Sequence, residues 1–341
     1  MLGLISPLIR PGLVRAISPR IKPFLRPVLQ GIAKRVYPRQ AEQHDANIAF
    51  VERLYDDLSS LAQYPDTFKA VLGAAGLWNR QYFHHDITTR KPPCFVTNTP
   101  EDIAIAFRPE RDIDYASILT HITGIAARLA DSPYREELRD GIRVINAGHT
   151  LARQLFEGVP TCMARYTNHD RIALSWVQRY DPPTNCTPSL HVTDMALLYT
   201  LLVSWDVERY CPDLLDEIRH AAIDMVACVL EVKQHTIDQV AISLEAADMM
   251  CRRFRLPTGL LRRDLASPSF GMYYPHIPIR MILETHDRFI AQREPCHKPP
   301  DLVEMVLRHY ETSDAPLTPH GVFDVYAKQG RAVPYDPSAQ L

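Results

Sequence analysis

A bundle of α-helices without membrane spans is the fold that the sequence predicts, and three observations support it. Apolar residues recur every three or four positions over much of the chain, which is the period of one helix face. The composition, 46% hydrophobic and 23% charged, is typical of a globular protein. No run of eighteen residues lacks a charge, since even Val192 to Trp205 contains Asp194. We therefore expect an all-α protein that is soluble or peripheral rather than membrane-spanning.

Residues 1–43 are predicted to form a basic, proline-rich, amphipathic arm. The first 40 residues hold no acidic side chain, and apolar residues alternate with eight basic ones. These are Arg10, Arg15, Arg20, Lys22, Arg26, Lys34, Arg35 and Arg39. Such a pattern is typical of a segment that lies on a membrane surface, so residues 1–40 are a candidate peripheral membrane contact. Five prolines between Pro7 and Pro27 argue against a long regular helix, because an interior proline removes a hydrogen bond. The alternatives are a bent arm packed on its own domain and an organelle transit peptide.

Residues 44–254 are expected to form the helical catalytic domain. Helical spacing of apolar residues runs from Ile48 to Leu61, starts again at Phe68, and returns over residues 116–158. These segments are interpreted as packing helices, and they precede the part of the chain that carries the polar motifs.

Three further helices are predicted around two histidines. One follows His191 as far as Val203, a second covers residues 214–232, and a third starts near His235. The first two of these helices, of comparable length, run down and back up and return the chain to its starting level, so His191 and His235 can lie at the same end of a bundle. Residues 255–341 are dense in proline and predict a wrapping tail with short helices at 277–290 and 302–310.

The charge and the cysteine pattern exclude several classes. A net charge of -2 and a pI of about 6.7 give no reason to expect a nucleic-acid partner. Seven cysteines without a Cys-x-x-Cys pair indicate neither a disulfide framework nor a structural zinc site. We expect a reducing, cytoplasmic setting, with peripheral contact to a membrane.

Two short clusters concentrate the chemistry. Pro188-Ser189-Leu190-His191 precedes one predicted helix, and Lys233-Gln234-His235 with Asp238 precedes another. Phosphoryl chemistry without a metal needs one imidazole to attack, a second to protonate the leaving oxygen, and cations or hydroxyls to hold the phosphate. The first cluster also stands at a helix N-terminus, where backbone N–H groups favour an anion. No metal or other cofactor is expected.

The two clusters together resemble the paired signature of the type 2 phosphatidic acid phosphatase superfamily. The similarity covers about residues 159–250, and the branch with Leu between Ser and His includes inositol phosphorylceramide synthases and related lipid phosphatases. The wider superfamily includes vanadium haloperoxidases. Its members are commonly bundles of membrane-spanning helices, a feature that the present sequence lacks.

The resemblance implies a role for each matching residue. His235 would be the nucleophile that takes the phosphoryl group, Asp238 would orient it, and His191 would protonate the departing oxygen. Ser189 and Lys233 would hold the phosphate oxygens. The family also has an upstream cation near a proline, for which the nearest match is Arg165 after Val159-Pro160-Thr161, with Arg171 and Arg179 as competitors.

One spacing departs from the family pattern. Three residues separate the family's histidine and aspartate, whereas two separate His235 and Asp238. Positions i+3 and i+4 lie on the same helix face as i, so the pair can still touch.

The expected function is a metal-independent phosphatase that acts on a lipid-like phosphate or isoprenyl diphosphate through a phosphohistidine. Three alternatives stay open: transfer of the phosphoryl-bearing group to an alcohol, as in inositol phosphorylceramide synthases, a vanadium-dependent haloperoxidase, and an inactive membrane-associated helical protein.

Overall fold

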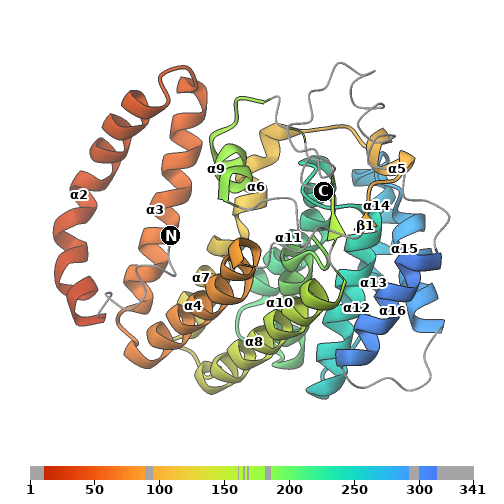
Figure 1. Cartoon of the computed structure of the whole chain (residues 1–341). Coiled ribbons are helices and arrows are strands. Elements are labelled where there is room, and N and C mark those ends of the chain that lie inside the picture. Colours follow the sequence, from red (N-terminus) through yellow and green to blue (C-terminus); the bar gives the residue numbers. More distant parts are fainter. Residues whose placement is uncertain are drawn as a thin grey trace.

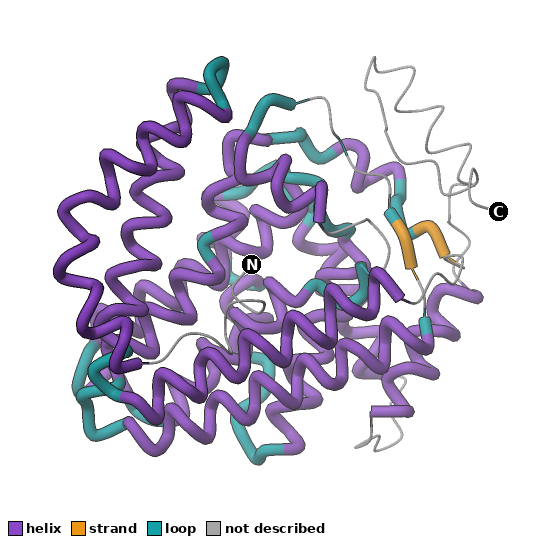
Figure 2. The backbone as a smooth tube through the Cα atoms, turned by 60° about the vertical axis from the view of Figure 1, so that its left-hand side comes forward, coloured by secondary structure: helices purple, strands orange, loops and turns teal. Residues whose placement is uncertain are grey.

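The structure, a computed structural model, confirms the all-α fold (Figures 1 and 2). It describes residues 11–88, 95–159, 161–163, 166, 169–180, 186–291 and 299–312. The helices up to the first motif are α2 (Pro11–Val36), α3 (His44–Leu61), α4 (Pro65–Thr88), α5 (Pro100–Ala104), α6 (Asp112–Ala116), α7 (Ile118–Leu129), α8 (Arg135–Gly158) and α9 (Ile172–Tyr180). Those that follow are α10 (Leu190–Ser204), α11 (Pro212–Glu231), α12 (Ile237–Arg253), α13 (Leu260–Leu265), α14 (Pro268–Tyr273), α15 (Ile279–Ala291) and α16 (Pro299–Thr312).

Two strands of two residues each, β1 (Phe95–Val96) and β2 (Thr161–Cys162), pair in parallel beside the helices (Figure 2). They join segments that are far apart in the sequence, because Phe95 lies opposite Thr161. This short pairing brings the segment before α5 next to the segment that leads toward α9.

The central helix of the bundle is α10. Every residue from Val192 to Leu202 is buried, because α8, α11 and α12 pack around it. A helix that is covered on all sides tolerates apolar residues on every face, which explains why most of residues 192–203 are apolar. His191, in its first turn, is instead partly exposed.

The long helix α2 corrects one expectation from the sequence. It runs from Pro11 to Val36, so the inference that the prolines prevent a long helix is wrong. Pro19, Pro23 and Pro27 are four residues apart and therefore lie on one side of the helix. The missing N–H donors fall on that one strip, and the helix can keep its hydrogen bonds around the rest of its circumference.

Helix α2 packs along α3, and the two form one side of the molecule (Figure 1). Lys22 pairs with Asp56 at 2.7 Å and Arg26 with Glu52 at 2.7 Å, so basic side chains of α2 meet acidic side chains of α3. In the part of the chain that the structure describes, no helix combines the length and the apolar character that a membrane span needs.

The C-terminal elements pack back onto the bundle. Helix α15 lies against α12, and α16 lies against α8. They correspond to the helices predicted at 277–290 and 302–310, whereas α13 and α14 were not predicted. Residues 313–341 of the predicted tail are outside the described residues.

Candidate active site

The structure brings the two motif histidines together. His191 stands in the first turn of α10, and His235 stands in the turn between α11 and α12. Their ring centroids are 6.4 Å apart, with the ring planes tilted by 51°. Helix α11 returns the chain from the far end of α10, and this out-and-back path places both imidazoles at one end of the bundle.

The turn before His235 is tight and well defined. Lys233 has φ of 55°, a left-handed conformation, which reverses the chain after α11. The backbone N–H groups of Gln234 and His235 both donate to the carbonyl of Val229, at 3.1 and 3.2 Å. Thr236 then caps α12, because its hydroxyl accepts from the Gln239 N–H. The position of His235 is thus set by backbone hydrogen bonds on both sides.

Two acceptors fix the proton on the His235 ring. Nδ1 lies 3.1 Å from the Cys186 carbonyl oxygen and 3.1 Å from Gln239 Oε1. Since neither oxygen can donate, Nδ1 carries the hydrogen, and in the neutral ring the lone pair is on Nε2. A histidine held this way can act as a nucleophile or a base through Nε2.

Gln239 is itself held on both ends of its amide. Oε1 also accepts from the Thr236 N–H at 3.1 Å, so the oxygen must face the turn, and Nε2 donates to Thr97 Oγ1 at 2.6 Å. The Gln239 and Thr236 side chains thus form a capping box at the start of α12. A buried glutamine oriented by donors and acceptors therefore positions the imidazole of His235.

Gln239 occupies the position that the family pattern gives to aspartate, and sequence reasoning missed it. It is four residues after His235, with three residues between, whereas Asp238 is three residues after. The spacing alone could have identified it. The nearest carboxylate, that of Asp238, is one position earlier in the sequence.

Asp238, which the resemblance pairs with His235, contacts a different histidine in the structure. Asp238 Oδ2 lies 2.9 Å from His309 Nε2, a contact that ties α12 to α16. The acceptors at Nδ1 of His235 are the Cys186 carbonyl and Gln239. Asp238 and Gln239 are consecutive on α12 and therefore point about 100° apart, so that Gln239 faces His235 and Asp238 faces α16.

His191 is oriented by an aromatic ring. It stacks on Tyr115 of α6, with centroids 4.0 Å apart and planes 23° from parallel. Tyr115 is 2% exposed, so it forms a fixed wall on one face of the imidazole. Stacking holds the ring plane and leaves the ring edge, where both nitrogens lie, as the reactive part.

Ser189 is a helix cap. Its hydroxyl accepts from the Val192 N–H at 3.5 Å, and its own backbone N–H donates to Ser243 Oγ of α12 at 2.7 Å. Ser189 is fully buried, and the bond to Ser243 ties the start of α10 to α12. Ser189 therefore fixes the position of His191 relative to His235, in addition to the phosphate contact that the resemblance implies.

Lys233 is buried beside the histidine turn. It is 3% exposed, and its Nζ donates to the backbone carbonyl of Asp102 in α5. The ammonium group brings a positive charge into the turn that carries His235. The bond also anchors the turn to the β1–α5 segment.

Asp102 supports the same turn with its side chain. Oδ1 accepts from the Ile237 N–H at 2.7 Å, and Oδ2 accepts from the N–H and hydroxyl of Thr99. Burial raises the pKa of Asp102 to about 7, although the donated hydrogen bonds act in the opposite direction. This carboxyl group therefore titrates near neutral pH, directly behind the first turn of α12.

The predicted cation Arg165 lies outside the described residues, as does the side chain of Arg179. Arg171 pairs with Asp112 at 2.7 Å. Arg108, directly before Pro109, also fits the description of an upstream cation near a proline, and sequence reasoning missed it. Its backbone N–H and Nη1 both bind Glu231, at 2.9 and 3.1 Å, two residues before Lys233.

No family model, no curated protein and no solved structure was found to match this chain. The site is therefore interpreted from its own geometry.

Proposed function

We propose that the chain catalyses phosphoryl transfer from a lipid-like phosphate or an isoprenyl diphosphate through a phosphohistidine at His235. The observation that carries this proposal is the approach of His191 and His235, whose ring centroids are 6.4 Å apart. Attack on phosphorus and proton donation each need contacts of about 3 Å, one on either side of the reacting group. Two imidazoles this close can act on the same phosphoryl group, one as the nucleophile and the other as the proton donor.

The reaction starts with nucleophilic attack. Nε2 of His235 uses its lone pair to form an N–P bond while the bond from phosphorus to the leaving oxygen breaks. His191, as an imidazolium, gives its proton to that oxygen, so the lipid alcohol or the phosphorylated product leaves neutral at that atom. The Nδ1 proton stays between Cys186 and Gln239, which supports the positive charge on the phosphorylated ring.

The second half returns the enzyme to its starting state. Neutral His191 removes a proton from water, the water oxygen attacks phosphorus, and the N–P bond breaks. Phosphate is released, His235 regains its lone pair, and His191 is again protonated. Lys233 supplies a cation beside the turn, and the N-terminus of α10 supplies the positive end of a helix dipole.

A peripheral membrane contact through residues 1–40 belongs to the same proposal. Large apolar side chains on α2 are exposed at helical spacing. They are Ile21, Phe24, Val28, Ile32 and Val36, and we call them the α2 stripe. Phe24 is 66% exposed. An exposed apolar stripe on a basic helix supports docking on an anionic lipid surface, where a lipid-like substrate is found.

Phosphate release from phosphatidic acid and from an isoprenyl diphosphate, both in mixed micelles, tests the function. We expect His235→Ala to abolish release and to abolish acid-labile labelling of the protein by 32P. His220→Ala is the matched control, since His220 is exposed on α11, and it should leave release unchanged. Equal turnover in His235→Ala and the wild type would reject the mechanism.

The role of His191 has its own test. With p-nitrophenyl phosphate the leaving group needs no proton, so His191→Ala should lose far less of its phosphorylation rate than it loses with an alkyl phosphate. An equal loss with both substrates would show that His191 is not the acid. Added alcohol acceptors separate hydrolysis from transfer, because transfer yields a new phosphoester instead of phosphate.

A further inference from the structure

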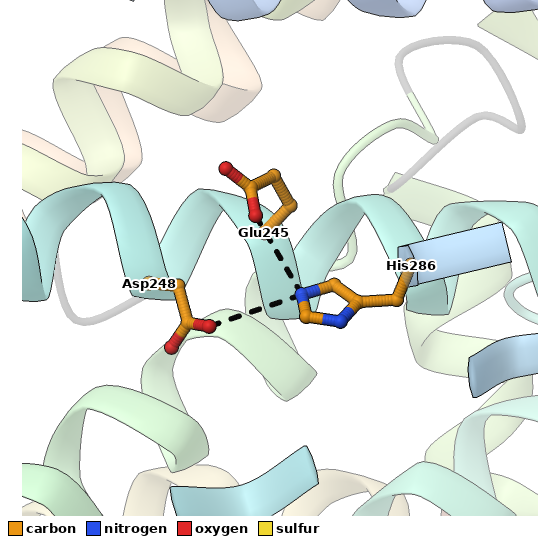
Figure 3. Close-up of side chains that lie close together, drawn as sticks. All are labelled: Glu245, Asp248 and His286. Carbon is orange, nitrogen blue, oxygen red and sulfur yellow. Dashed lines mark ion pairs between the residues drawn. The ribbon is translucent and has the colours of Figure 1, made fainter. Parts of the chain in front are cut away.

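A second group of polar side chains lies where α12 packs on α15. Glu245 and Asp248 are three residues apart on α12 and therefore share a face, and His286 approaches them from α15 (Figure 3). Glu245 is 1% exposed and His286 is fully buried, whereas Asp248 is partly exposed. Buried charged groups in proteins are paired with one another or coordinate metal ions, so this arrangement is a candidate ligand set.

The distances within this group are those of ligands around one ion. His286 Nε2 lies 3.6 Å from Glu245 Oε2 and 3.8 Å from Asp248 Oδ2, and the three ligand atoms are all within 4.8 Å of one another. These separations are too long for hydrogen bonds. A zinc ion with nitrogen and oxygen ligands at about 2.0–2.2 Å holds tetrahedral neighbours about 3.4 Å apart. A small contraction would bring all three atoms onto such an ion.

The second oxygen of each carboxylate accepts a hydrogen bond from another part of the chain. Arg252 Nη2 donates to Glu245 Oε1 at 2.7 Å, and the Gly259 N–H donates to Asp248 Oδ1 at 2.8 Å. Hydrogen bonds of this kind orient the carboxylates that bind metals in proteins. Glu245 Oε2 and Asp248 Oδ2 are the atoms that face the imidazole (Figure 3).

Charge also favours a cation here. Two carboxylates, those of Glu245 and Asp248, lie here beside one arginine, Arg252, which pairs with Glu245. We infer that Glu245, Asp248 and His286 bind a divalent transition-metal ion of the zinc type, with a water molecule as fourth ligand on the more exposed side of Asp248. One imidazole and two carboxylates form a donor set that suits this class of ion.

The ion links α12 to α15 and lies apart from the candidate phosphoryl site. Glu245 is ten residues beyond His235, which is about 15 Å along the chain at the rise of an α-helix. The proposal is independent of the chemistry at His235. The cysteine pattern predicted no structural zinc site, and a carboxylate pair with a distant histidine has no such pattern.

Metal binding by the purified full-length chain tests the inference. After saturation with zinc chloride and dialysis, elemental analysis should find one zinc per chain, and zinc should raise Tm relative to the EDTA-treated protein. His286→Gln should bind zinc at least tenfold more weakly and lose the Tm shift. Asp248→Asn, at the least buried ligand, repeats the test if His286→Gln does not fold.

The matched control is His149→Gln. His149 is also a buried histidine beside a carboxylate, but its Nε2 lies 3.0 Å from Asp194 Oδ2, a direct hydrogen bond with no room for an ion. This variant should keep the bound zinc. A wild type that binds no zinc, or zinc that remains in the folded His286→Gln or Asp248→Asn variant, would overturn the proposal.

Discussion

Replacement of Gln239 by methionine tests whether this residue organises the site. Methionine has nearly the same length but no hydrogen-bonding amide, so three bonds are lost: those to His235 Nδ1, to the Thr236 N–H and to Thr97 Oγ1. Loss of a cap costs about 1 kcal/mol. A buried donor left without its acceptor costs about 1–3 kcal/mol more. We therefore expect the free energy of unfolding to fall by about 2–4 kcal/mol.

Urea denaturation followed by circular dichroism measures this loss, and Gln234→Met is the control. Gln234 is equally buried and lies in the same turn, but its amide makes one 3.3 Å bond, to the Val232 carbonyl, and its Oε1 is buried without a partner. Its replacement should cost about 1 kcal/mol or less. Similar losses in the two variants would refute the assignment of Gln239 as the residue that holds the turn.

Three other predictions follow from the same contacts. In assays of phosphate release, Gln239→Met should lower turnover about 10–100-fold, as the loss of an orienting partner does. Asp238→Asn should keep turnover near that of the wild type, because Asp238 contacts His309. If Asp238→Asn lost more turnover than Gln239→Met, the role that the resemblance gives to Asp238 would be supported instead. The pKa of Asp102 is about 7 when folded and 3.8 in the reference state, so the unfolded chain ionises first, and folding stability is lost as pH rises from about 4 to about 7. Between pH 5 and pH 8 this group should remove about 2–3 kcal/mol, and urea titrations of Asp102→Asn should lack that decrement; an equal decrement in the variant would contradict it. Replacement of Phe24 and Val28 by serine should weaken co-sedimentation of the protein with phosphatidylserine vesicles without lowering Tm. Replacement of the buried Ile48 by serine, as a control, should lower Tm. Unchanged co-sedimentation of the first variant would exclude the α2 stripe as the membrane contact.

Sequence patterns sufficed for the helices that carry the site. The apolar spacing after His191, over 214–232 and after His235 corresponds to α10, α11 and α12, and the out-and-back path follows from their comparable lengths. Periodicity reports burial of one helix face, and these helices are buried along most of their length. The sequence therefore sufficed to predict that the two histidines can lie close together.

The patterns were insufficient where a contact depends on the rest of the chain. The prolines of α2 suggested a broken helix. The low helix propensity of proline does not take into account that the lost hydrogen bonds all lie on one side of this helix. Asp238 and Gln239 are neighbours, and their different directions depend on which segment packs against each: α16 beside Asp238, and the β1–α5 segment beside Gln239. Long-range contacts of this kind are absent from a reading of local motifs.

The bonds from the β1–α5 segment have a consequence for how this protein can be divided. Thr97 binds Gln239, the Asp102 carboxylate binds the Ile237 N–H, and the Asp102 carbonyl binds Lys233, across separations of 142, 135 and 131 residues. A fragment that starts at Cys186 would contain His191, His235 and every neighbouring motif residue, yet it would lack these partners. Contacts between such distant segments also form late when a chain folds. The motifs are local, but the site they make depends on both halves of the polypeptide.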